Sequence, residues 1–256
     1  MAPSQRRNQL AEIIRSQGFA TLLDLTTQMG VSESTIRRDL NALEVEGKVK
    51  RTHGGVLYIG RENKAPHFAG LEPSNLNHKR SIARAAAGLV APGESVVLDG
   101  GTTTFELATL LLGRGIHVIT NSLPVANLFS TDETSELIFV GGVVQQKTGV
   151  AIGNHTVNML KSIRARKTFI SSAGITDDGL FNQNLLLVEA EQAMISCADQ
   201  TILLADSTKF GQTSIAKVCE LNAINRAVVD AKLLPHWNNV LQSNSVELIN
   251  APAEMV

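Results

Sequence analysis

The chain has 256 residues, of which 43% are hydrophobic, 18% charged and 4% aromatic. This length suits one or two domains with sizeable cores, and the composition excludes a disordered chain, a collagen-like chain and a coiled-coil array. No apolar run approaches the roughly 18 residues that a membrane span requires, and the start of the chain is polar and basic, so we expect a cytoplasmic protein.

Cysteine and histidine give no sign of a metal site. Cys197 and Cys219 form no C-x-x-C pair and lie near no histidine at ligand spacing, and no two of the six histidines have metal spacing. We therefore expect neither a metal nor a disulfide framework.

Charge differs between the two ends of the chain. The first 61 residues hold nine basic and six acidic residues, a net charge of +3, whereas the rest holds fourteen basic and eighteen acidic residues, a net charge of −4. A positive net charge of this size usually reflects only a solvated surface. The pattern of the residues must therefore decide whether the N-terminal region binds an acidic partner such as a nucleic acid.

Apolar residues recur at helical spacing in the N-terminal quarter. They predict one helix ending at Gly18, a second over Leu22–Met29 and a third over Glu33–Glu46, with glycines after each. The segment Lys48–Ile59 then changes to β-branched and apolar residues about a Gly54-Gly55 pair, which predicts a two-stranded hairpin. This order of elements is a winged helix-turn-helix.

The third predicted helix has two different faces. Ile36, Leu40 and Leu43 share the core face, and polar residues lie opposite. Arginine and asparagine side chains there suit base edges and phosphates in a major groove. The alternative is an ordinary solvated helix with ion pairs to Glu33 or Glu44, but the turn, the short second helix and the basic hairpin favour DNA. The candidate DNA-binding residues are Ser34, Thr35, Arg37, Arg38 and Asn41 on the helix and Lys50, Arg51 and His53 in the hairpin.

A polar, proline-containing stretch separates two predicted domains: 1–60 is the winged helix-turn-helix, 61–76 the linker and 77–256 an α/β domain. In the last of these, short apolar strands alternate with helical segments. The predicted strands are Ser95–Leu98, His117–Thr120, Leu137–Val140, Thr168–Ser171, Thr201–Ala205, Ala227–Val229 and Val246–Ile249. This alternation predicts an αβα sandwich, a mostly parallel sheet covered on both faces, with ligands outside the carboxyl ends of the strands.

The loop after the first of these strands, Asp99-Gly100-Gly101-Thr102-Thr103-Thr104, leads into a helix. Backbone N–H groups, the helix dipole and threonine hydroxyls together make a cradle suited to phosphate. The alternative is a tight turn in which Thr102 only caps the helix. The loop matches neither a Walker A motif nor G-x-G-x-x-G, so we expect no nucleotide cofactor.

Other strand ends should face the same rim of a parallel sheet. They offer Asn121, Gly141-Gly142, and Asp206 with Lys209. Lys209 can neutralise a phosphate, and Asp99 or Asn121 can bond sugar hydroxyls. Each can equally be an ordinary polar loop residue.

Motifs along nearly the whole chain share one resemblance. They are VSESTIRRDLNALEVEGKVKRTHGG (Val31–Gly55), ESVVLDGGTTT (Glu94–Thr104), TNS (Thr120–Ser122), the Gly141-Gly142 pair and ADSTKFG (Ala205–Gly211). These motifs resemble the DeoR family of bacterial transcriptional repressors. The resemblance implies an N-terminal domain that binds operator DNA and a C-terminal domain, similar to ribose-phosphate isomerases and CoA transferases, that senses a phosphorylated sugar or related metabolite. It implies effector contacts at Lys79, Asp99, Gly101, Thr102, Thr103, Thr104, Asn121, Gly141, Gly142 and Lys209.

One segment departs from that family pattern. Many relatives carry a lysine before an Ala-Met pair, where this chain reads VEAEQAMI, with Glu191 near the place of that lysine. A glutamate in the pocket would repel an anionic group, so the effector should be less highly charged or differently oriented.

Two functions of different classes follow. The first is a non-enzymatic repressor of sugar catabolism genes, a homo-oligomer (dimer or tetramer) that presents paired helices to half-sites about 34–36 Å apart. The second is a sugar-phosphate isomerase or acyl transferase with an accessory DNA-binding domain. Its base would be Asp99, Glu189 or Asp206, but the sequence shows no activating partner for any of them, which favours the repressor.

Overall fold

The computed structural model describes residues 3–17, 19–45, 48–52, 55–58, 75–231 and 233–252. The chain divides into Met1–Lys64 and Ala65–Val256, which we call the N-terminal unit and the C-terminal unit. All but the last two residues of the predicted linker 61–76 lie outside the described residues. Within the described ranges, no helix combines the length and the apolar character needed to cross a membrane.

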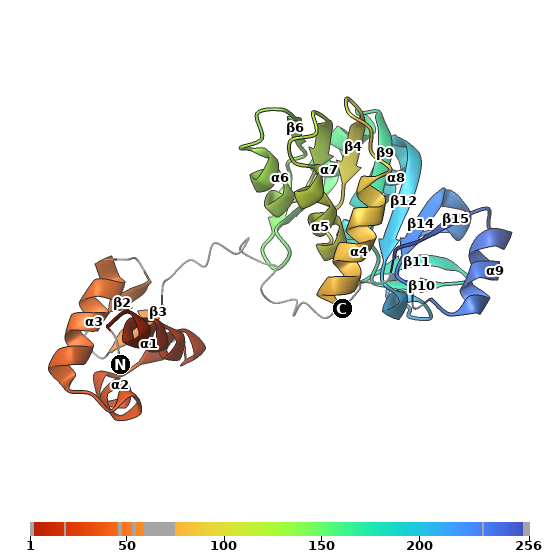
Figure 1. Cartoon of the computed structure of the whole chain (residues 1–256). Helices are drawn as coiled ribbons and strands as arrows, with labels where there is room; N and C mark the ends of the chain where they lie inside the picture. The colour runs from red at the N-terminus through yellow and green to blue at the C-terminus, as the bar shows by residue number, and fades with distance from the viewer. Residues whose placement is uncertain are drawn as a thin grey trace. The chain divides into compact units, whose positions relative to one another are not determined.

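The described part of the N-terminal unit is a winged helix-turn-helix, as predicted (Figure 1). Its elements are α1 (Pro3–Gln17), β1 (Phe19–Ala20), α2 (Leu22–Met29), α3 (Glu33–Val45), β2 (Val49–Arg51) and β3 (Val56–Tyr58). β2 and β3 form the antiparallel wing, and β1 pairs with the other edge of β3. The sequence analysis missed β1 because a two-residue strand has no periodicity.

Local sequence explains the tight helix-turn-helix. Thr21 and Asp24 form a capping box at the start of α2, because the Thr21 hydroxyl accepts from the Asp24 N–H and the Asp24 carboxylate accepts from the Thr21 N–H. Gly30 ends α2 with φ of 61°, a left-handed conformation that favours glycine. The apolar faces of α1, α2 and α3 then meet in one core around Leu25, Ile36 and other fully buried residues.

The C-terminal unit alternates strands and helices. Its elements are α4 (Leu76–Ala87), β4 (Ser95–Leu98), α5 (Thr102–Leu111), β5 (His117–Thr120), α6 (Leu123–Phe129), β6 (Glu136–Phe139), β7 (Val143–Gln145), β8 (Val150–Ile152), α7 (Asn154–Lys161), β9 (Ala165–Ile170), β10 (Gly174–Thr176), β11 (Gly179–Asn182), α8 (Leu185–Ser196), β12 (Ala198–Ala205), the 3-10 helix η2 (Ser207–Lys209), β13 (Ala216–Cys219), the 3-10 helix η3 (Leu221–Ala223), β14 (Arg226–Val229), α9 (Pro235–Ser243) and β15 (Glu247–Asn250).

Seven parallel strands form the central sheet in the order β15-β14-β12-β9-β4-β5-β6. The chain runs from β4 outward to β6, returns to β9 beside β4, and then builds the other half outward to β15. The boundary between β4 and β9 is therefore the topological switch point of the sheet, where open α/β sheets form a crevice outside the carboxyl ends of their strands.

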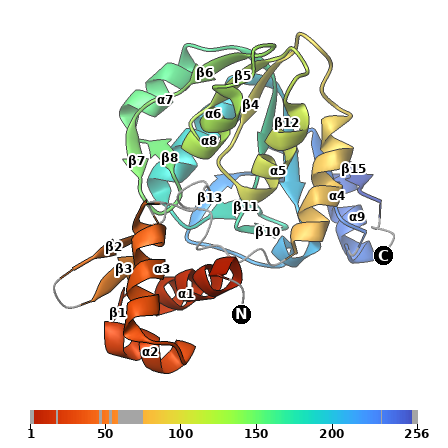
Figure 2. The same cartoon turned by 60° about the vertical axis from the view of Figure 1, so that its left-hand side comes forward.

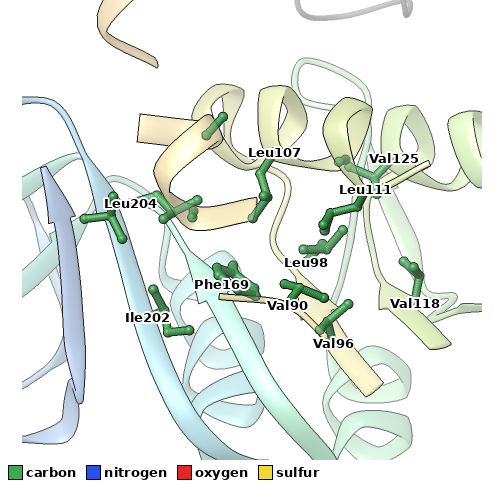
Figure 3. Packing of buried hydrophobic residues seen from close by; sticks show 14 of the residues in the cluster. Val90, Val96, Leu98, Leu107, Leu111, Val118, Val125, Phe169, Ile202 and Leu204 are labelled. Atoms are coloured by element: carbon green, nitrogen blue, oxygen red, sulfur yellow. The ribbon is translucent and has the colours of Figure 1, made fainter. Parts of the chain in front are cut away.

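Side chains that alternate along the strands pack into two hydrophobic layers, one on each face of the central sheet. Val96 and Leu98 of β4 pack with α4, α5 and α6 on one face, whereas Val97 packs with α7 and α8 on the other. Figure 3 shows Leu107 and Leu111 of α5 facing the sheet residues of the first layer. The predicted αβα sandwich is thus confirmed, and Figure 2 shows its helices from a second direction.

Two small antiparallel sheets were not predicted. β7 and β8 form a hairpin, and β10, β11 and β13 form a three-stranded sheet in the order β10-β11-β13. Both follow the carboxyl ends of strands of the central sheet, β7 after β6 and β10 after β9. They therefore shape the rim on which the ligand site was expected.

Candidate functional site

One face of α3 in the N-terminal unit carries polar and basic side chains. Ile36, Leu40 and Leu43 are buried in the core, whereas Ser34, Arg37, Arg38 and Asn41 are exposed and Thr35 is half-buried. The predicted division of the helix into two faces is therefore present in the structure.

Contacts of Arg37 and Arg51 organise this face. Arg37 pairs with Glu33 one turn earlier, with Nη2 and Oε1 2.6 Å apart and both side chains more than half exposed. The Arg51 guanidinium on the wing donates to Asn41 Oδ1 at 2.6 Å, and the Arg51 N–H donates to Glu44 Oε1 at 3.0 Å. The two Arg51 contacts fix the wing against α3. The exposed Arg37–Glu33 pair stabilises the helix by only about 0.3–0.5 kcal/mol, so a phosphate can readily displace Glu33 from Arg37.

The wing contributes further cations. Lys50 and Arg51 of β2 are exposed, whereas His53 lies outside the described residues. Behind α3, the buried Asp39 accepts from Arg6 Nε at 2.6 Å, which ties α1 to the recognition helix. The sequence analysis missed this pair because Asp39 lies on the buried side among apolar residues.

In the C-terminal unit, the loop after β4 enters α5 as predicted. The N-cap of α5 is Gly101, in an extended conformation with no side-chain cap, so Thr102 does not cap the helix. The first N–H groups of α5 consequently lack a side-chain acceptor and keep their capacity to bind an anion.

Asp99 holds this loop in place. It is 3% exposed, and its carboxylate accepts from the Gly100 N–H, from the Ser171 N–H at 3.0 Å and from Ser171 Oγ at 2.6 Å. Burial raises the pKa of Asp99, and the bonds from Ser171 oppose the rise. Asp99 thus joins the carboxyl end of β4 to that of β9.

The switch point between β4 and β9 opens into a pocket of about 280 Å³. It is lined by residues 99–103, by residues 171–173 after β9, by residues 182–183 after β11, by Leu187 and Glu191 of α8, by residues 204–206 with Lys209, and by Lys79, Thr148 and Val150. The structure therefore brings together Lys79, Asp99, Gly101, Thr102, Thr103 and Lys209 among the predicted effector residues.

The two lysines give one part of the pocket positive charge. Burial lowers the pKa of Lys79, Asp206 opposes that effect, and the neighbouring Lys209 lowers it further. Two ammonium groups that repel each other in a half-buried pocket favour an anionic ligand between them.

Asn121 and Thr104 do not line the pocket. Asn121 is fully buried, and its Nδ2 donates to the Ala151 carbonyl of β8 at 2.8 Å. Thr104 is also fully buried, one residue deeper into α5 than the lining threonines. The β7–β8 hairpin occupies the space beyond the carboxyl end of β5. The expectation that the residues after every strand face one open rim is therefore wrong at β5.

Gly141 and Gly142 likewise lie outside the pocket. The Gly141 carbonyl accepts from Thr156 Oγ1 of α7 at 2.9 Å. A Cβ on Gly142 would lie 2.1 Å from the same Oγ1. Gly142 therefore makes room for α7.

Glu191 is the acidic residue of α8 that enters the pocket. It is 1% exposed, and its Oε1 accepts from Asn182 Nδ2 at 2.7 Å. Sequence reasoning marked its position but missed Asn182, Thr148 and Ser171. Ser171 ends a predicted strand and could have been found by the same rim rule, whereas Asn182 and Thr148 come from hairpins that were not predicted.

In the described ranges, no group of three or more His, Cys, Asp or Glu side chains is arranged so that it could hold a metal ion. A winged helix-turn-helix joined to an α/β unit with its own pocket defines a class of protein, the DNA-binding transcriptional regulator with a separate sensor domain.

Comparison with known proteins identifies the family. The sequence matches the model of the DeoR-like helix-turn-helix domain over residues 6–62 and that of the DeoR C terminal sensor domain over residues 74–231. It is 32% identical over 253 residues to the HTH-type transcriptional regulator YulB of Bacillus subtilis, covering 98% of each chain. It is 30% identical over 253 residues to the HTH-type transcriptional regulator UlaR of Escherichia coli, covering 97% of this chain and 99% of that one. The chain belongs to the DeoR family of transcriptional regulators.

Solved structures show weaker likeness. Ribose 5-phosphate isomerase A from Methanocaldococcus jannaschii is 18% identical with a TM-score of 0.40, covering 54% of this chain and 55% of that chain. The eIF2B delta subunit from Chaetomium thermophilum is 14% identical with a TM-score of 0.41, covering 72% of this chain and 58% of that chain. The full-length relatives are regulators, which indicates a regulator rather than an enzyme.

Proposed function

We propose that this regulator represses carbohydrate catabolism genes in the cytoplasm, and that a phosphorylated sugar in the pocket changes its affinity for operator DNA. One observation carries the proposal: the uncapped start of α5 lines the same pocket as Lys79 and Lys209. Free N–H groups at a helix N-terminus and two nearby ammonium groups together suit a phosphate dianion.

The N-terminal unit supplies the operator contacts. The exposed polar face of α3 enters the major groove, and the wing approaches the backbone. The assigned residues are Ser34, Thr35, Arg37, Arg38, Asn41, Lys50, Arg51 and His53. A homo-oligomer, either a dimer or a tetramer, places two such helices in half-sites about 34–36 Å apart.

In the pocket, the phosphate lies against Thr102, Thr103 and the two lysines. Asp99 and Gly101 act by holding the loop, since the Asp99 carboxylate is already bonded to the end of β9. Thr104, Asn121, Gly141 and Gly142 lie outside the pocket and make no contact with the phosphate.

Two measurements test this function. Operator affinity is measured at physiological salt by fluorescence anisotropy on the DNA upstream of the chain's own gene and on a scrambled duplex. Ribose 5-phosphate, glucose 6-phosphate and the free sugars are then added. We expect a sequence preference that a sugar phosphate changes and a free sugar does not. The proposal fails when no preference exists, or when no sugar phosphate alters it.

A matched pair of variants connects the effect to the pocket. Lys209→Ala should abolish the response to sugar phosphate, whereas Lys161→Ala, which removes an exposed lysine of α7, should retain it. Equal responses of the two variants would place the phosphate elsewhere.

A further inference from the structure

The pocket has a second region, around Glu191, that the phosphate contacts leave unused. Glu191 Oε1 accepts from Asn182, but Oε2 is buried and has no hydrogen-bond partner among the described residues. An unpaired carboxyl oxygen in a buried position is costly unless a ligand or a proton satisfies it.

The groups that face Glu191 come from three other elements. Asp99 lies on the β4–α5 loop, Asn182 ends β11, and Cys219 ends β13. Burial is the main cause that raises the pKa of Cys219 to about 12, so its thiol is neutral. Burial and the charge of Asp99 raise the pKa of Glu191 well above its ordinary value, and the bond from Asn182 opposes the rise.

The lysines do not neutralise Glu191. Lys79 interacts with Asp206, Lys209 and Glu106, whereas the charge that acts on Glu191 is that of Asp99. The pocket therefore has a cationic region and an acidic region.

Hydrogen bonding distinguishes the two acids. Asp99 accepts from the Gly100 N–H with Oδ1 and from the Ser171 N–H and hydroxyl with Oδ2, an arrangement that favours its ionised form. Glu191 has one donor on Oε1 and none on Oε2. Of these two acids Glu191 is therefore the one to carry a proton, on Oε2, which meets no hydrogen-bond partner among the described residues.

We propose that Glu191 binds the ligand in its uncharged form and donates a hydrogen bond from Oε2 to a hydroxyl or carbonyl oxygen remote from the phosphate. The effector is then a phosphate monoester whose far end is hydroxylated and uncharged. A second anionic group is disfavoured because it would meet Asp99. This inference rests on the proposed sugar-phosphate function and specifies the ligand class of the same pocket.

A ligand series tests the proposal on the unaltered protein. Affinities are measured by calorimetry at pH 7 for inorganic phosphate, glucose 6-phosphate, 6-phosphogluconate and glucosamine 6-phosphate, which differ in the charge away from the phosphate. We expect glucose 6-phosphate to bind at least about tenfold, or about 1.4 kcal/mol, more tightly than 6-phosphogluconate, because the carboxylate of 6-phosphogluconate would meet the charge of Asp99. Tightest binding of glucosamine 6-phosphate that is lost in Glu191→Gln, where Asp99 is unchanged, would show an ionised Glu191 and overturn the proposal.

The pH dependence supplies the second readout. Between pH 7 and 9 the phosphate remains a dianion, since its second pKa is about 6. Loss of the Glu191 proton should weaken binding by up to about tenfold per pH unit once the pH exceeds its pKa. Deprotonation of Lys79 also weakens binding, but equally in every Glu191 variant. Glu191→Gln, whose amide donates at every pH, should show a shallower decline, whereas Glu189→Gln, on the exposed side of α8, should match the parent.

The outcomes separate the two proposals. Absence of binding for all four phosphates overturns the sugar-phosphate function and this inference with it. Two outcomes overturn the inference but not the phosphate site. The first is binding of inorganic phosphate with no preference among the six-carbon phosphates. The second is an identical pH profile for Glu191→Gln and the parent. Thermal unfolding of each variant confirms that the ligand series compares folded proteins.

Discussion

Replacing Gly101 by alanine tests whether close packing of the glycine loop against β9 builds the pocket. The added Cβ would lie 1.9 Å from Ser171 Oγ, 2.7 Å from Ser171 Cβ and 3.3 Å from Asp99 Oδ2. Rotating the serine hydroxyl away would break its bond to Asp99, and the serine Cβ would still clash. Overpacking costs about 1–3 kcal/mol and a lost hydrogen bond to a buried charge about 1.5–3 kcal/mol, so we expect Gly101→Ala to lose about 2.5–6 kcal/mol.

Calorimetry with and without sugar phosphate measures both consequences. For a unit of this size the loss corresponds to a fall of roughly 5–25 °C in the transition temperature of the C-terminal unit. Ligand binding should weaken as well, because the loop must move. Gly141→Ala is the matched control, since its added Cβ meets no heavy atom within 4 Å. Equal transitions and equal ligand affinities for Gly101→Ala and Gly141→Ala would refute the packing argument.

Three further predictions concern the exposed face of α3 and the pocket. Arg38→Ala should weaken operator binding by about 1–3 kcal/mol and, where the arginine contacts a phosphate, reduce the salt slope by about one; unchanged anisotropy titrations would remove α3 from the groove. Glu33→Gln should strengthen operator binding several-fold, since it removes an acid that pairs with a neighbouring arginine, and weaker binding would contradict this. Lys79→Ala should reduce the effect of sugar phosphate on operator affinity more than it reduces sugar-phosphate affinity, whereas Lys209→Ala should reduce both in proportion. Calorimetry measures sugar-phosphate affinity, and anisotropy measures its effect on operator affinity. If the two quantities fall in the same proportion in Lys79→Ala as in Lys209→Ala, Lys79 has no separate role in coupling.

The central sheet could be predicted because its inner strands are buried on both faces and its edge strands β6 and β15 are still apolar. Each of its seven strands overlaps a predicted apolar run, from Ser95–Leu98 to Val246–Ile249. The small sheets escaped prediction because their strands have only three or four residues, whether exposed as in β7 or buried as in β8. β7 exposes 70% of Val143, and its three residues carry no contrast between two faces. Short strands whose pairing depends on tertiary contacts leave little trace in a single sequence.

The same distinction divides the site. The loop from Asp99 to Thr103 and Lys209 were predicted because strand order alone brings the carboxyl ends of parallel strands together. Asn121 follows that rule too, yet β8 accepts its side chain and separates it from the pocket. Asn182 enters the pocket from β11, whose position depends on the unpredicted three-stranded sheet. Strand order therefore located the site, and the two small sheets selected its residues.

The position of Lys79 links the pocket to the rest of the chain. It lies in the first turn of α4, four residues after Asn75, where the described part of the C-terminal unit begins. Asn75 Nδ2 donates to Asp206 Oδ1 at 3.5 Å, and His78 pairs with Asp230, so the start of α4 is attached to the loops beside the pocket. A ligand shifts a conformational equilibrium only by its preference between two states, and useful coupling requires about 1–3 kcal/mol. One charge-assisted hydrogen bond supplies that amount. A phosphate contact to Lys79 made in only one state is therefore sufficient to change how α4 starts, and the segment that precedes α4 leads directly to the DNA-binding unit.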